Sequence, residues 1–72
     1  MLKKEIVITS AYITLAQLLK FANVIDSGGQ AKDFLAKNTI LINNEPDNRR
    51  GRKLMPGDQI VINHELYLTL KK

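Results

Sequence analysis

The sequence contains no cysteine and no tryptophan, and only one histidine. Without cysteine there is no disulfide framework, no thiolate zinc site and no cysteine nucleophile, so we expect packing or binding to stabilise the fold. No apolar run is long enough to span a bilayer. The N-terminal residues lack the apolar core of a signal peptide, and we therefore expect a cytoplasmic protein.

Catalytic groups are also scarce. His64 falls in an expected tight turn, where we interpret it as a surface residue. The seven Asp and Glu residues are scattered, and several lie where turns and caps use aspartate structurally. No glycine cluster has the spacing of a nucleotide-binding loop. We therefore expect neither an enzyme nor a metal or cofactor site.

What the chain does have is positive charge. Its 72 residues carry eleven Lys and Arg against seven Asp and Glu, a formal net charge of +4. The hydrophobic fraction of 44% is typical of a folded protein, and the length predicts one domain over residues 1–72. An excess of basic over acidic residues favours a polyanionic partner, although it says nothing about the fold.

Hydrophobic periodicity predicts two short helices after a strand at residues 5–9. Leu15, Leu18, Leu19 and Ala22 make one apolar helical face, with Thr14 as the N-cap, and this helix should end near residues 22–23. Lys20 should face solvent on its opposite side.

The second helix should begin at Ser27. Ser27 and Gln30 have the spacing of a capping box, in which each side chain would bond to the other residue's backbone amide. Ala31, Phe34 and Leu35 repeat at helical spacing, and Asn38 should end the helix as a left-handed C-cap.

From residue 39 onward the period is two, which predicts strands at residues 39–43, 59–63 and 66–70. Asn43-Asn44 and His64-Glu65 should be tight turns, and Met55-Pro56-Gly57-Asp58 has the composition of a type II turn. Pro46 confines residues 45–47 to a sheet edge or a turn. The sequence therefore predicts an α+β fold, with two short helices packed on a small, antiparallel-rich twisted sheet of roughly four to five strands.

The aromatic residues are few. Phe21 and Phe34 lie on or beside apolar helical faces, and we expect both in the core. Tyr12 and Tyr67 could stack on bases, but two tyrosines without a paired aromatic signature favour partial burial. Base stacking is therefore not the main binding mode that we expect.

The run Asn48-Arg49-Arg50-Gly51-Arg52-Lys53-Leu54 concentrates four of the eleven basic residues. Arginine offers a rigid fork of donors that suits phosphate, and the glycine lets the backbone approach a partner closely. The alternative is a solvated hairpin loop. A second feature, Ser27-Gly28-Gly29-Gln30-Ala31-Lys32, predicts exposed amides at a helix start, where Lys32 could reinforce a bound anion. Lys20 and Lys37 could extend the basic surface.

The order of these features resembles that of the S4-type RNA-binding domain. The resemblance covers roughly residues 5–65 and is carried by residues 15–20, 27–32, 40–44 and 56–60. The inserted residues 45–54 are similar to those of the YaaA subgroup, small stand-alone bacterial versions of this domain. The chain departs from the family pattern at Gly28, where many members have arginine, and at Thr14-Leu15-Ala16, where many have Arg-Leu-Asp.

The resemblance implies an αL motif, in which two helices and the following strand and loop present a basic face to structured RNA. Carried over by position, Ser27, Gln30, Ala31 and Lys32 match the second-helix motif, and Asn43 matches the asparagine at the strand end. The resemblance also implies a ribosome-associated or ribosome-assembly role, with ribosomal RNA or a ribosomal subunit as the partner. The expected RNA-binding residues are Ser27, Gly28, Gly29, Gln30, Lys32, Asn43, Arg49, Arg50, Arg52 and Lys53. The charges leave two alternatives open: a protein-binding adaptor that docks on an acidic partner, and a DNA-binding protein.

Overall fold

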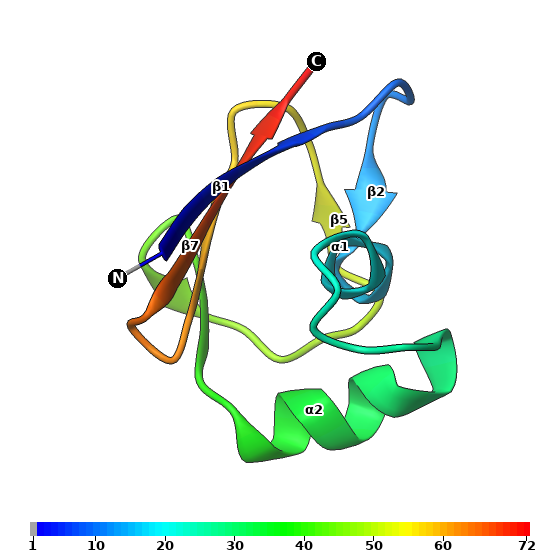
Figure 1. Cartoon of the computed structure of the whole chain (residues 1–72), viewed down its shortest axis with the longest axis vertical. Helices are drawn as coiled ribbons and strands as arrows, with labels where there is room; N and C mark the ends of the chain where they lie inside the picture. Colours follow the sequence, from blue (N-terminus) through cyan, green and yellow to red (C-terminus); the bar gives the residue numbers. More distant parts are fainter. Residues whose placement is uncertain (1) are drawn as a thin grey trace.

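The computed structural model describes residues 2–72, apart from the surroundings of Gly28. Figure 1 shows the elements arranged as a strand layer beside two helices. In chain order they are β1 (Leu2–Val7), β2 (Ile13–Thr14), α1 (Leu15–Phe21), the 3₁₀ helix η1 (Gly28–Gln30), α2 (Ala31–Lys37), β3 (Ile40–Ile42), β4 (Glu45–Pro46), β5 (Lys53–Leu54), β6 (Gln59–Ile62) and β7 (Leu66–Lys71).

Five strands form the main sheet, in the order β1-β7-β6-β3-β4. The pairs β3–β4, β3–β6 and β6–β7 are antiparallel, whereas β1 runs parallel to β7 with Leu2 opposite Leu66. The α+β class is confirmed, but the sheet is mixed. No tight turn joins β1 to β7, so no local signal in the sequence sets their relative direction. β1 also lies a little earlier than the expected strand at residues 5–9.

A second, two-stranded sheet was not expected. β2 and β5 pair antiparallel, with Ile13 opposite Leu54 and Thr14 opposite Lys53. In Figure 1 this pair lies beside α1, away from β1 and β7. It joins the residues just before α1 to the end of the basic run.

The core lies between the helices and one face of the main sheet. Leu15, Leu18 and Leu19 of α1 are each 0% exposed, and Leu35 of α2 joins the same cluster. The sheet contributes alternate residues, because successive side chains of a strand point to opposite faces. These residues are Ile40, Ile42, Ile60, Ile62, Leu68 and Leu70.

The expected turns at Asn43-Asn44 and at residues 55–58 are confirmed, and the turn expected at His64-Glu65 begins one residue earlier. Asn43 and Asn44 both have positive φ, at 51° and 72°, and they connect Ile42 directly to Glu45. Gly57 has φ of 100°, and the Asp58 amide donates to the Met55 carbonyl at 3.0 Å. The turn between β6 and β7 centres on Asn63 and His64, both of which are exposed and have positive φ.

The start of α1 is confirmed and is stronger than expected. The Gln17 amide donates to Thr14 Oγ1 at 3.2 Å, and the Thr14 amide donates to Gln17 Oε1 at 2.9 Å. This is a complete capping box. The helix ends at Phe21 with Ala22 as its C-cap, and Lys20 is exposed as expected.

The expected capping box at Ser27 is wrong. The Gln30 amide donates to the Ser27 carbonyl at 3.1 Å, and Gln30 Oε1 accepts from the Asp26 amide. The chain therefore makes the 3₁₀ turn η1 first, and α2 begins at Ala31 without a side-chain cap. The left-handed C-cap is also wrong: Asn38 is extended, with φ of −128°, and its Nδ2 donates to the Phe34 carbonyl at 2.8 Å. The side chain thus satisfies a terminal carbonyl that a left-handed backbone would otherwise satisfy.

The expected burial of Phe21 is wrong as well, since its side chain is 57% exposed. Phe21 directly precedes Ala22, which is buried, and each residue advances about 100° around a helix. Phe21 therefore lies at the edge of the face that Leu18 and Leu19 bury, where solvent reaches its side chain. Phe34 is half-buried against the core. Tyr67 in β7 is also half-buried, as expected, but it does not belong to the core cluster.

Candidate nucleic-acid interface

The basic segment, defined as residues 49–53, is held against the start of α1 by its own main chain. The Leu15 amide donates to the Arg52 carbonyl at 2.9 Å, and the Ala16 amide donates to the Arg50 carbonyl at 3.0 Å. With Gln17 capped by Thr14, the first three amides of α1 all have protein partners. The segment links β4 of the main sheet to β5 of the second sheet. It is therefore a connection between two sheets, and the alternative of a hairpin loop is wrong.

Asp47 organises the arginines of the basic segment. Its Oδ2 accepts from Arg49 Nη2 and from Arg52 Nη1, both at 2.8 Å, and its Oδ1 accepts from Arg49 Nε at 3.1 Å and from the Arg49 amide at 2.9 Å. The Asp47 side chain is only 9% exposed. The hydrogen bonds from Arg49 hold the pKa of the Asp47 carboxyl well below its usual range, against the opposing effect of burial. Asp47 in turn raises the pKa of Arg49.

The remaining two cations of the segment are not tied to carboxylates. In residues 2–72, neither Arg50 nor Lys53 takes part in an ion pair. Arg50 is exposed, and Lys53 places its ammonium 5.0 Å from the centroid of the Tyr12 ring. The segment therefore presents Arg50 and Lys53 as unneutralised charges, while Arg49 and Arg52 share the charge of one carboxylate.

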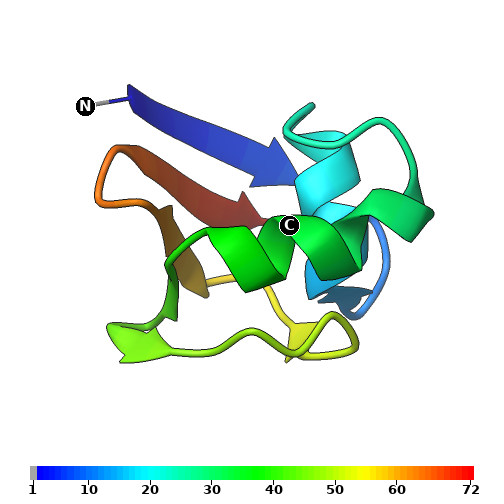
Figure 2. The ribbon, with the colours of Figure 1, turned by 90° about the horizontal axis from the view of Figure 1, so that it is seen from below.

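A groove brings the basic segment and α2 together. A depression of about 420 Å³ is lined by Lys32, Leu35 and Ala36 of α2 and by Asn48 and Arg50. We refer to it as the α2 groove. Figure 2 shows α2 lying alongside the connection that leads from β4 to β5. An adjoining depression of about 310 Å³ shares Leu35 and Asn48 and continues past Asn38 and Thr39. Two cations from distant parts of the sequence thus line one concave surface.

The chemistry of the α2 groove is that of anion binding. Lys32 and Arg50 supply charge, and the Asn48 side chain has no hydrogen-bond partner within the described residues. Leu35 and Ala36 add apolar lining between the polar groups. In the part of the chain that the structure describes, no group of three or more His, Cys, Asp or Glu residues could hold a metal ion. No helix of residues 2–72 has the length and apolar character needed to cross a membrane.

The S4 domain family matches residues 6–69 of the chain. This chain belongs to the S4 domain family. It is also similar to a curated bacterial protein, the probable ribosome maturation protein RlbA of Bacillus subtilis (strain 168), with 58% identity over 55 residues. The matched region covers 76% of this chain and 78% of that protein. The resemblance found in the sequence is thereby confirmed.

Other expected contact residues of this S4 domain lie around η1. Ser27, Gly29 and Gln30 are exposed, and the surroundings of Gly28 lie outside the described residues. Gln30 Oε1 is occupied by the Asp26 amide. A Cβ added to Gly29 would meet only Ser27 Oγ, at 3.9 Å, so the space around residue 29 would accommodate a side chain. A phosphate at the Gly28 and Gly29 amides stays a prediction.

Asn43 is placed differently. Its Nδ2 donates to Asp58 Oδ1 at 3.2 Å, and its Oδ1 accepts from the Gln59 amide at 3.0 Å. Asn43 therefore joins the turn after β3 to the turn before β6, and it does not line the α2 groove. A contact between Asn43 and RNA stays a prediction.

Two residues that organise this surface were not singled out as site residues from the sequence. For Asp47, the signal in the sequence is its spacing of two residues from Arg49 and five from Arg52. Tyr12 was expected to be partly buried, and it is 45% exposed beneath Lys53. Its position follows from the β2–β5 pairing, for which two residues in each strand give no clear sequence signal.

Proposed function

We propose that this S4 domain is a non-enzymatic, cytoplasmic RNA-binding protein that recognises structured RNA, specifically ribosomal RNA, in ribosome assembly or maturation. Membership of the S4 domain family supports RNA binding, and the similarity to a probable ribosome maturation protein of Bacillus subtilis supports a role in ribosome assembly or maturation. The observation that carries the proposal is the α2 groove, where Lys32 and Arg50 line one depression.

The α2 groove suits a phosphate backbone because its two charged side chains extend from backbone that hydrogen bonds hold in place. Lys32 extends from α2, and the Arg50 main chain is bonded to Ala16. A positively charged surface of fixed shape favours RNA whose phosphates have a fixed spacing, since phosphate contacts position a partner without reading its sequence. Lys53 extends the same charge toward β2.

Arg49 and Arg52 have a second role in this proposal. A guanidinium has five donors, and Arg49 keeps donors beyond those given to Asp47 while its side chain is 69% exposed. Both arginines can therefore hold the basic segment in shape and still face a phosphate. Arg50 contributes charge without any such structural bond, so it is the cleanest residue to test.

The test measures affinity for a ribosomal RNA fragment at several salt concentrations. Arg50→Ala should lower the slope of log affinity against log salt by about 0.7 to 0.9, the value for one lost phosphate contact. Folding should change by less than about 0.5 kcal/mol, because Arg50 is exposed and unpaired within the described residues.

Lys4→Ala is the matched control. Lys4 is an exposed cation of β1, and it lines a different depression, beside Gln59 and Tyr67. An Arg50→Ala slope equal to that of the parent would contradict the proposed interface. Equal affinity for a DNA duplex would indicate a DNA-binding protein, and no RNA affinity in the parent would favour the adaptor.

A further inference from the structure

A second groove lies at the other end of the basic segment and carries no charge of its own. It is a depression of about 460 Å³ lined by residues 7–13, Gln17 and Phe21. We refer to it as the Tyr12 groove. None of the described residues that line it is charged. It therefore differs in chemistry from the α2 groove.

The Tyr12 groove collects apolar side chains that the fold leaves uncovered. Val7 is 67% exposed, Phe21 is 57% exposed and Tyr12 is 45% exposed. These are three of the five large apolar side chains exposed in residues 2–72. Scattered exposed apolar residues are ordinary, but several in one concave site mark a binding surface.

Unused polar groups border the same site. The backbone amides of Thr9, Ser10 and Ala11 donate no hydrogen bond within the described residues. Gln17 uses its Oε1 in the α1 capping box, which leaves its Nε2 without a partner in the same part of the chain. An occupant with an apolar face and a polar edge would satisfy both kinds of group.

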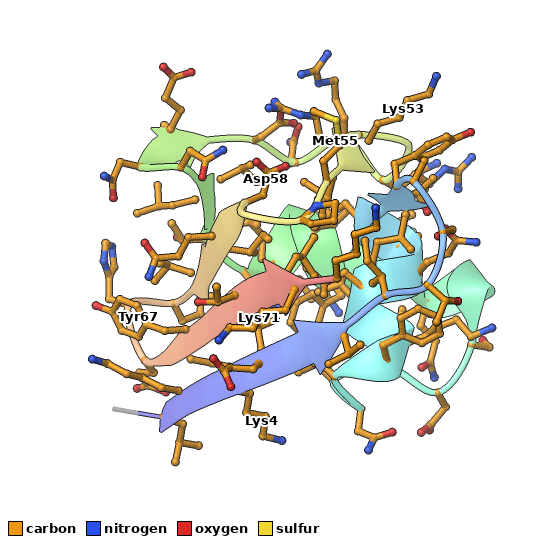
Figure 3. All side chains as sticks on the ribbon, turned by 90° about the horizontal axis from the view of Figure 1, so that it is seen from above. Lys4, Lys53, Met55, Asp58, Tyr67 and Lys71 are labelled. Carbon is orange, nitrogen blue, oxygen red and sulfur yellow. The ribbon has the colours of Figure 1, made fainter. Side chains whose placement is uncertain are left out.

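Lys53 connects this groove to the proposed RNA interface. It belongs to the basic segment and lies opposite Thr14 in the β2–β5 pair, while its ammonium is 5.0 Å from the Tyr12 ring centroid. In Figure 3, Lys53 projects far from Lys4 of β1 and Tyr67 of β7. A phosphate held by Lys53 would lie beside the uncharged groove.

We infer that the Tyr12 groove binds a single unstacked nucleobase of the RNA whose backbone follows the basic segment. The inference rests on the proposed function and names the RNA feature that would be recognised, a looped-out nucleotide. Tyr12 and Phe21 offer aromatic surface for stacking, and the amides of residues 9–11, which donate no hydrogen bond within the described residues, belong to residues that line the same groove and could bond to the edge of the base. Every base has a π-face, so this contact selects an extruded nucleotide rather than a particular sequence.

The experiment compares two RNA hairpins with the same stem, one fully paired and one with a single bulged 2-aminopurine nucleotide. The parent protein should bind the bulged RNA more tightly and quench its fluorescence. Tyr12→Leu should weaken binding to the bulged RNA by about 5- to 150-fold, the range for loss of one base–aromatic stack, and should abolish the quenching. Phe21→Leu should act in the same direction.

Tyr67→Leu makes the same substitution at a tyrosine outside the groove and should leave both affinities unchanged. Equal parent affinity for the two hairpins, with no quenching, would overturn the inference while leaving RNA binding intact, and the groove would then suit an apolar side chain of a protein. A folded Tyr12→Leu variant that weakens both hairpins equally would also overturn it. If the parent binds neither hairpin nor the ribosomal RNA fragment, the proposed function itself fails.

Discussion

Asp47 Oδ2 lies 2.8 Å from Arg52 Nη1, which joins the residue after β4 to the residue before β5. The two sheets share no strand, and this ion pair ties together the two ends of the connection between them. The Asp47 side chain is nearly buried at 9% exposure, whereas Arg52 is 35% exposed. The carboxylate is therefore the partner whose loss should matter more.

Asp47→Asn should lower the free energy of unfolding at neutral pH by about 1 kcal/mol. The hydrogen bonds from Arg49 and Arg52 lose the negative charge of their acceptor, but the loss is moderate because solvent already screens the charges of the two arginines. The measurement is the urea midpoint. Glu45→Gln removes the same charge from an exposed residue of β4 and should leave the midpoint nearly unchanged. A midpoint for Asp47→Asn that matches Glu45→Gln would show that the ion pair does not stabilise the fold.

The free energy of unfolding should depend on pH in acid because of the same carboxylate. In the folded protein the pKa of Asp47 lies below its ordinary value of 3.8, so the unfolded chain binds a proton at Asp47 more readily than the folded protein does. The extra stability is therefore fully present above about pH 4 and declines as the pH falls further, through the folded-state pKa. Urea midpoints should fall less steeply below about pH 4 in Asp47→Asn than in the parent. Identical pH profiles would contradict the lowered pKa.

The two helix starts should respond differently to loss of a hydroxyl. Thr14 caps α1 through its Oγ1, so Thr14→Ala should destabilise the domain by about 1 kcal/mol. Ser27→Ala should have little effect, because η1 uses the Ser27 carbonyl in its hydrogen bond to Gln30. Thermal or urea denaturation of both variants is the measurement. Equal losses would mean that the serine hydroxyl stabilises the second helix after all.

Gly51 should be dispensable for folding. A Cβ at residue 51 would meet no atom within 4 Å, and its φ lies outside the left-handed region. Gly51→Ala should therefore leave stability unchanged or raise it by up to about 1 kcal/mol. If RNA approaches the backbone there, the added methyl should weaken binding to the ribosomal RNA fragment.

Gly57→Ala is the reverse control for that experiment. Gly57 has φ of 100°, so alanine should strain its turn and cost stability without changing RNA affinity in the folded protein. Parent-like RNA binding by Gly51→Ala would exclude a close backbone contact at residue 51.

Local chemistry made much of the fold predictable. Asn43, Asn44 and Gly57 identify their turns because few residues tolerate positive φ. The apolar spacing of α1 correctly predicts the burial of Leu15, Leu18 and Leu19. Each of these features depends only on residues that lie close together in the sequence. Long-range choices, such as the parallel pairing of β1 with β7, leave no comparable local pattern.

The candidate site was predictable in composition but not in arrangement. The sequence singles out Lys32 and Arg50 as basic residues, and only the packing of α2 beside the β4–β5 connection brings them to one groove. Arg49 and Arg52 looked equivalent to Arg50, yet their bonds to Asp47 separate them from it. Which of several neighbouring arginines bonds to a carboxylate depends on the geometry of the backbone, and the composition of the segment does not specify that geometry.

The parallel pairing of β1 with β7 also sets an order of events during synthesis. Leu2 lies opposite Leu66, so β1 pairs with the strand of the main sheet that is made last. β7 can already pair with β6 through a short turn, whereas joining β1 closes nearly the whole chain into a loop at a larger entropic cost. A growing polypeptide therefore cannot complete the main sheet until β7 has left the ribosome, and until then the inner edge of β1 has no partner.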